Sequence, residues 1–213
     1  MSNHQKEGIA LNALKKVNRG LIVTLAVVLA VLIYLAVNAV IRAGDRTEIQ
    51  NLLEEYVPAE AQLYTVTREQ TAKSYGNMSE AEKTALIEHY STALDSYYAN
   101  QPDALRSAAE MIARTVYQED GLWIDSVDSK ILKLSSFTFN GSAASVNAKI
   151  QMEFTGSAYY ISGQTKQQTV TERREYETTF ILKKENNEWK LFYSAGLPLL
   201  TETYSNEVYN IAY

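Results

Sequence analysis

The chain of 213 residues has no cysteine, two histidines and three prolines. The lack of cysteine excludes disulfides, thiolate nucleophiles and cysteine-based metal sites. His4 and His89 lie far apart in the sequence, and one histidine does not build a conventional histidine-rich metal site. The phosphate-binding pattern Gly-x-x-x-x-Gly-Lys and the nucleophile pattern Gly-x-Ser-x-Gly are also missing. We therefore expect no metal, no cofactor and no enzymatic activity.

Negative charge predominates after the first 19 residues. The tail holds four of the chain's 20 basic residues and one of its 25 acidic residues, which leaves 16 basic and 24 acidic residues beyond it. Nucleic-acid binding draws much of its free energy from the neutralisation of phosphates by basic side chains. A region with a net charge of −8 is therefore not expected to bind nucleic acid.

One long apolar run interrupts this polar composition. Leu21 to Ile41 contains 21 residues without a charge. As a helix it would span about 32 Å, which matches the roughly 30 Å hydrocarbon core of a bilayer. A cleavable signal peptide is the competing interpretation, but its apolar region is usually only about 7–15 residues long. We predict an uncleaved transmembrane helix over residues 20–42.

The basic residues beside this run predict its orientation. Four Lys or Arg residues precede the run, whereas only Arg42 and Arg46 follow it closely. Basic residues are enriched on the cytoplasmic side of membrane helices. We therefore expect residues 1–19 to form a cytoplasmic tail, and residues 43–213 to lie outside the cytoplasm in the single-pass protein.

Helical patterns occupy about residues 46–118. Asp45 and Glu48 predict the capped start of a new helix, and Pro58 is expected to kink or end its first section. Ser79 and Glu82 match a capping box, which predicts a second helix. Pro102 is suited to the first turn of a third helix.

Alternating strand patterns follow over about residues 122–195. We expect strands at 122–127, 130–140, 144–154, 169–184 and 188–194. Asn140-Gly141 predicts a hairpin, and Glu185-Asn186-Asn187 predicts a turn. Helices followed by an antiparallel sheet indicate an α+β domain with its helices on one face of the sheet.

The last strand contains Asn187-Glu188-Trp189-Lys190-Leu191. With three leading helices and a long antiparallel sheet, this sequence resembles the NTF2-like (cystatin-like) superfamily over about residues 47–195. The resemblance implies a curved sheet with a pocket between it and the helices. A short tail, one anchor and such a domain also look like the VirB8-like subunits of conjugative type IV secretion machines, although the Asn-Pro-x-Gly type signature of that family is absent.

Some NTF2-like enzymes use a pocket carboxylate as a base and tyrosines as hydrogen-bond donors. The residue types of this chain permit such a site, but tyrosines that only anchor the interface between helices and sheet explain the same pattern. Consecutive aromatics in a strand place one ring on each face, so one ring of Tyr159-Tyr160 can face a partner. The candidate pocket or interface residues are Tyr56, Tyr90, Tyr117, Asp125, Tyr159 and Tyr160.

The C-terminal segment, residues 196–213, is more apolar than expected for a tail that makes no contacts. It can pack on its own domain, add a strand or engage a partner, and we favour packing on the same chain. The sequence thus predicts a structural or assembly subunit of a bacterial cell-envelope complex, with other proteins or further copies of itself as partners. The alternative is a small-ligand binder or isomerase-like enzyme that uses the NTF2-like pocket.

Overall fold

The structure is a computed structural model that describes residues 19–65, 73–117, 122–158 and 168–194. Its internal contacts divide the chain into two units, Met1–Arg46 and Thr47–Tyr213. The first described helix, α2 (Arg19–Gln62), contributes residues to both units.

The described part of the first unit is the apolar half of α2. Large side chains on all sides of this half are exposed, including Leu25 at 72%, Tyr34 at 69% and Val40 at 73%. A helix that is apolar all round needs either a protein core or a lipid environment. Among the described residues, α2 is the one helix long and apolar enough to cross a membrane.

Helix α2 corrects the expected start of a new helix after the apolar run, and it shows that Pro58 does not end a helix. No new helix starts at Asp45 or Glu48, because α2 continues unbroken for 44 residues, and Pro58 lies inside it. A proline within a helix removes a backbone hydrogen bond and costs about 3 kcal/mol. The side chains of Leu53, Val57 and Ala61 around it are fully buried, and their packing offsets that cost.

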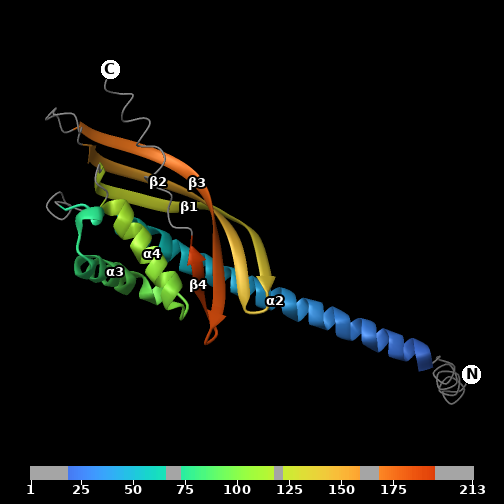
Figure 1. Cartoon of the computed structure of the whole chain (residues 1–213). Coiled ribbons are helices and arrows are strands. Elements are labelled where there is room, and N and C mark those ends of the chain that lie inside the picture. Colours follow the sequence, from blue (N-terminus) through green and yellow to red (C-terminus); the bar gives the residue numbers. More distant parts are fainter. Residues whose placement is uncertain (1–18, 66–72, 118–121, 159–167, 195–213) are drawn as a thin grey trace, which may run out of the picture. The chain divides into compact units, whose positions relative to one another are not determined.

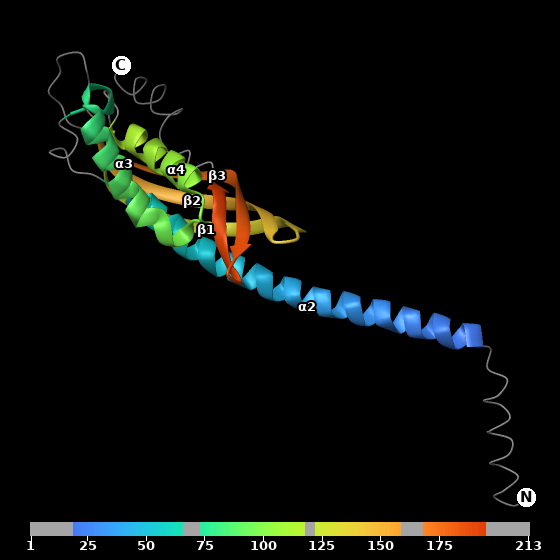
Figure 2. The same ribbon diagram turned by 60° about the horizontal axis from the view of Figure 1, so that its bottom comes forward.

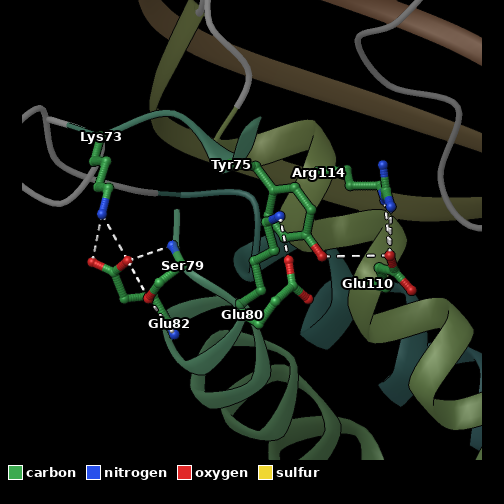
Figure 3. Close-up of polar contacts among 8 residues, drawn as sticks. Lys73, Tyr75, Ser79, Glu80, Glu82, Glu110 and Arg114 are labelled. Carbon is green, nitrogen blue, oxygen red and sulfur yellow. Dashed lines mark hydrogen bonds and ion pairs between the residues drawn. The ribbon is translucent and has the colours of Figure 1, made fainter. Parts of the chain in front are cut away.

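Helix α3 (Glu80–Leu94) begins with the predicted capping box. The Glu82 amide donates to Ser79 Oγ at 3.3 Å, and the Ser79 amide donates to Glu82 Oε2 at 2.6 Å. Lys73 Nζ also donates to Glu82 Oε2, at 2.7 Å (Figure 3). The hydrogen bonds from Lys73 and Ser79 lower the pKa of the Glu82 carboxyl to about 2.

Replacing Ser79 with alanine should lower the free energy of unfolding by about 1 kcal/mol, because the Glu82 amide in the first turn of α3 loses its acceptor. Chemical denaturation measures this loss, and the exposed Thr84→Ala change on the same helix is the control. An equal loss for both variants would contradict the capping role.

The capping box should also make the stability of the domain depend on pH. Because the pKa of Glu82 is lowered, the contribution of its ionised carboxylate to the free energy of folding is complete above its unfolded pKa of about 4.3. This contribution disappears as the pH falls towards 2.

Helix α4 (Pro102–Val116) begins at Pro102, as predicted, and packs beside α3. Tyr75, in the short 3-10 helix η1 (Tyr75–Asn77), lies at the end of this pair. Its amide donates to the Tyr117 carbonyl at 2.6 Å, and Arg114 lies 5.0 Å from its ring. Figure 3 shows the Tyr75 hydroxyl directed at Glu110, which also pairs with Arg114.

In the described residues, four antiparallel strands form a single sheet in the order β1-β2-β3-β4. They are β1 (Leu122–Asn140), β2 (Ala143–Ala158), β3 (Gln168–Glu185) and β4 (Glu188–Ser194). The two predicted strands at 122–127 and 130–140 were wrong, because they form one strand, β1. Three register shifts along the β1–β2 pair bend β1 and disturb its alternation, which explains the error.

Both predicted turns that lie in the described residues are present. Gly141 adopts a φ of 59° between β1 and β2, and Asn186 and Asn187 adopt φ values of 49° and 69° between β3 and β4. Glycine and asparagine tolerate this left-handed conformation, which tight hairpins require. The predicted turn at 163–166 and the C-terminal segment lie outside the described residues.

The helices cover one face of the sheet (Figures 1 and 2). On β2 this face consists of Ala144, Val146, Ala148, Ile150, Met152 and Phe154, all buried. Phe180 and Leu182 of β3 and Trp189 and Leu191 of β4 extend the core. The predicted α+β fold, with three helices packed on an antiparallel sheet, is confirmed.

Candidate functional site

A buried group of polar side chains lies between α2 and the last two strands. We call Tyr56, Glu60, Tyr98, Tyr176 and Ser194 the tyrosine cluster. The hydroxyls of Tyr56 and Tyr98 are 3.3 Å apart, and Tyr56 also forms a side-chain hydrogen bond with Ser194. Tyr98 follows the 3-10 helix η2 (Asp95–Tyr97), which places it beside Leu191 of β4. The cluster therefore links α2, the end of η2 and the sheet.

Aromatic packing surrounds the centre of the tyrosine cluster. The ring centroid of Tyr56 lies 5.6 Å from that of Tyr97 and 6.1 Å from that of Tyr98, both edge-on. It lies 6.0 Å from the ring of Phe180, again edge-on. Such edge-to-face contacts stabilise a packed interior beyond the burial of area alone. Tyr56 itself is completely buried, so its ring helps to form the core.

Burial controls the electrostatics of the tyrosine cluster. Loss of solvent raises the pKa values of Tyr56, Tyr98 and Tyr176, and the nearby Glu60 carboxylate raises all three further. These hydroxyls therefore stay protonated at physiological pH. They can donate hydrogen bonds, but they cannot act as bases.

The carboxyl group of this cluster was not predicted from the sequence. Glu60 is only 1% exposed, although glutamate is rarely buried. It follows Tyr56 by four residues on α2 and therefore lies on the same face of the helix. That spacing was the available signal, but Pro58 between the two residues suggested the end of a helical section.

The other predicted site residues do not assemble into one site. Tyr90 and Tyr117 are buried and hydrogen-bonded to each other, and burial raises the pKa of Tyr90. Asp125 is exposed on β1, away from the buried hydroxyls. Tyr159 and Tyr160 lie outside the described residues. Of the six, only Tyr56 belongs to the tyrosine cluster.

Removing the Tyr56 hydroxyl tests whether the cluster stabilises the fold. The Tyr56→Phe variant leaves Tyr98 and Ser194 without that partner, and unpaired buried polar groups cost about 1–3 kcal/mol. Urea denaturation should show a loss of this size in the free energy of unfolding. Tyr97→Phe, a half-buried neighbour, is the matched control and should change it by less than about 0.5 kcal/mol. An unchanged stability for Tyr56→Phe would argue against a stabilising cluster.

The described residues contain no group of three or more His, Asp or Glu side chains that could hold a metal ion. His89 is exposed on α3, where its ring lies 5.3 Å from the ring of Tyr90. A single exposed imidazole beside an aromatic ring is an ordinary surface arrangement. The structure thus offers no assembled metal centre within those residues.

The opposite face of the sheet is polar and exposed. Lys149 Nζ lies 2.6 Å from Glu175 Oε2, and Arg173 Nε lies 3.6 Å from Glu153 Oε2, with all four side chains 42–59% exposed. A depression of about 140 Å³ opens on this face. Its lining residues are Asp128, Ser129, Lys130, Gln151, Glu153 and Arg173. Cross-strand ion pairs in water contribute little stability, so the charges on this face add little to the free energy of folding.

No protein-family model and no curated protein match the chain. Several solved structures are similar to parts of it, among them the following three. The intermembrane-space region of the chloroplast protein ARC6 has 19% identity and a TM-score of 0.30, covering 56% of this chain and 97% of that one. An "Ntf2 like protein involved in plasmid conjugation" has 10% identity and a TM-score of 0.36, covering 71% of this chain and 48% of that one.

The third similar structure is a putative calcium/calmodulin-dependent protein kinase II association domain from Xanthomonas campestris. It has 14% identity and a TM-score of 0.27, covering 57% of this chain and 84% of that one. The fold is assigned from the helices and strands of this structure and not from these similarities. An apolar N-terminal helix, helices on one face and, in the described residues, a four-stranded antiparallel sheet confirm the predicted α+β layout.

Proposed function

We propose that this protein is a membrane-anchored, non-enzymatic assembly subunit of the bacterial cell envelope, with its α+β domain outside the cytoplasm. The observation that carries the proposal is the apolar half of α2, whose large side chains are exposed on all sides. Exposing so much apolar surface to water is unfavourable, whereas the hydrocarbon core of a bilayer removes that surface from water. Anchoring also confines the domain to one surface, where it meets its partners at a raised effective concentration.

The interior of the domain supports a role without catalysis. Its buried tyrosines stay protonated, and Tyr56 is enclosed by three aromatic rings. Catalysis would require a substrate to reach an acid or base whose pKa lies near the working pH. The packing around Tyr56 instead resembles that of a structural core.

The exposed sheet face supports protein partners. The helices lie on the opposite face, so the row of Lys149, Gln151, Glu153, Arg173 and Glu175 remains open to a partner. Charges of both signs on such a surface contribute more to the choice and orientation of a partner than to affinity. We propose other envelope proteins, or a second copy of this chain, as the partners.

Membrane orientation can be tested with single cysteines, because the chain has none of its own. A cysteine at Ser142, in the β1–β2 turn, should react in intact cells with a maleimide that cannot cross the membrane. A cysteine at Ser2 should react only after the membrane is permeabilised. The reverse pattern would overturn the proposed orientation, and release of the protein by carbonate would argue for a cleaved signal peptide.

Partner binding can be tested by photocrosslinking in living cells. A photoreactive amino acid at Gln151 or Glu175 should capture specific proteins, whereas the same group at Thr92, exposed on α3, is the control. The layout supports a finer proposal of a VirB8-like role in conjugative secretion, which predicts that the captured proteins are components of a transfer machine. Equal or absent capture at all three positions would contradict the sheet face as the interface.

The tyrosine cluster favours a second candidate function, the binding of a small ligand by the NTF2-like pocket. A buried carboxylate, Glu60, close to tyrosine hydroxyls is the arrangement that such a site would use. This function predicts that Glu60→Gln abolishes ligand binding while the fold and the membrane insertion remain intact. The assembly function predicts that a folded Glu60→Gln variant still binds its protein partners, as photocrosslinking at Gln151 or Glu175 would show.

A further inference from the structure

An apolar patch interrupts the polar face of the sheet at β3 and β4. It consists of Ile181, Phe192 and Tyr193, which are 39%, 38% and 51% exposed. They are three of the five large hydrophobic side chains exposed in the described part of Thr47–Tyr213. The other two, Met111 and Leu132, lie on α4 and β1. The patch is thus a local concentration of apolar surface.

A bulge in β4 builds the apolar patch. Ile181 pairs with Tyr193, and Leu182 pairs with Leu191, so Phe192 is an extra residue in β4. In such a bulge two residues oppose one on the neighbouring strand. Phe192 and Tyr193 therefore lie opposite Ile181, and their rings are both exposed. Without the bulge, one of these two residues would face the core.

Basic side chains border the patch. Lys183 and Lys190 are cross-strand partners, and like charges in such a pair disfavour each other. Each is paired with a nearby carboxylate, Lys183 with Glu185 at 3.0 Å and Lys190 with Glu188 at 3.5 Å. The two carboxylates offset the two lysines, so an occupant of the patch would be favoured chiefly for its apolar side chains.

The sequence that follows β4 is rich in apolar side chains. Residues 195–213 contain two acidic residues, Glu202 and Glu207, and no lysine or arginine. The large apolar residues of this segment are Leu197, Leu199, Leu200, Tyr204, Val208, Tyr209, Ile211 and Tyr213. The segment starts two residues after Tyr193, and its 19 residues can extend about 60 Å, so its length does not limit access to the patch.

We propose that the patch formed by Ile181, Phe192 and Tyr193 is the docking surface for residues 197–213 of the same chain. Covalent linkage gives this segment an effective concentration of about the millimolar range at the patch, which favours it over a separate molecule. Docking removes the three side chains from water. The inference rests on the patch and on the segment, and it does not depend on the proposed function.

The absence of native cysteine allows a direct test in the full chain, reconstituted in lipid nanodiscs. A cysteine at Ile181 should react with a bulky maleimide about tenfold more slowly in the full chain than in a chain that ends after Ala195, because docking must open first. The protection should be unchanged over a hundredfold dilution, as expected for an intramolecular contact. A cysteine at Glu153, on the same face but outside the patch, should react equally in both chains.

Equal reaction rates at position 181 in the two chains would overturn the proposal. Protection that falls on dilution would also overturn it, because a second copy would then cover the patch. Protection that is present only in native membranes and disappears on purification would assign the patch to another protein. As a check independent of truncation, the full-length variant Leu199→Asp/Leu200→Asp/Tyr209→Asp should show the fast rate of the shortened chain.

Discussion

Replacing Phe180 with alanine is expected to lower the free energy of unfolding of the domain by about 3–5 kcal/mol. Phe180 is fully buried on β3, pairs with Val146 of β2 and meets the edge of the Tyr56 ring. Removing its ring leaves a cavity at the junction of the sheet with α2. Urea denaturation followed by the fluorescence of Trp189 would measure the loss, because Trp189 lies in the same core.

The neighbouring residue provides the control for this prediction. Thr179 is exposed on the polar face and donates a hydrogen bond to Asn147 at 3.0 Å. Thr179→Ala should cost no more than about 1 kcal/mol, because both partners can bond to water instead. If the two variants lost equal stability, Phe180 would not occupy the packed core described above.

Two aspartates in the middle of the apolar half of α2 should prevent stable insertion into the membrane. Each aspartate at the centre of a membrane helix costs about 2.5–3.5 kcal/mol, so Val28→Asp/Leu32→Asp should cost roughly 5–7 kcal/mol in addition to the lost apolar groups. Val28 and Leu32 are four residues apart and are 50% and 57% exposed, so no other part of the protein buries these side chains. Carbonate extraction should find the variant in the soluble fraction.

The control for insertion exchanges the same two side chains without adding charge. Val28→Leu/Leu32→Val keeps the length and hydropathy of the segment and should remain in the membrane fraction. An aspartate variant that stayed in the membrane fraction would show that another part of the chain anchors the protein. Loss of both variants from the membrane would indicate a general effect on expression or folding.

The sequence predicted the sheet well where alternation and turn residues agreed. β4 was predicted over its observed range, and the turns at Asn140-Gly141 and Asn186-Asn187 were correct, because their conformations depend on residues adjacent in the chain. β1 was predicted in two pieces, because its bulges disrupt the alternation. Bulges reflect how β1 fits against β2, and a single strand's sequence carries little information about such pairing.

For the candidate site too, some features were predicted from the sequence and others were missed. Tyrosines were expected at the interface between helices and sheet. Tyr56, Tyr90 and Tyr117 are buried, and Tyr56 packs against Phe180 of the sheet. Glu60 and Tyr98 were missed, because their importance comes from a meeting of segments separated by 38 residues in the chain. The apolar patch was missed for a similar reason: Ile181 and Phe192 become neighbours only through the register of β3 with β4.

The sequence by itself determined the apolar segment, the α+β order, the capping box at Ser79 and the tight turns. Each depends on composition or on contacts between residues close in the chain. The tertiary structure decided that α2 passes through Pro58, that Glu60 is buried beside three tyrosines, and that a bulge exposes Phe192 and Tyr193. Each of these depends on the packing of distant segments, where the free energy of burial outweighs the local preferences of the chain.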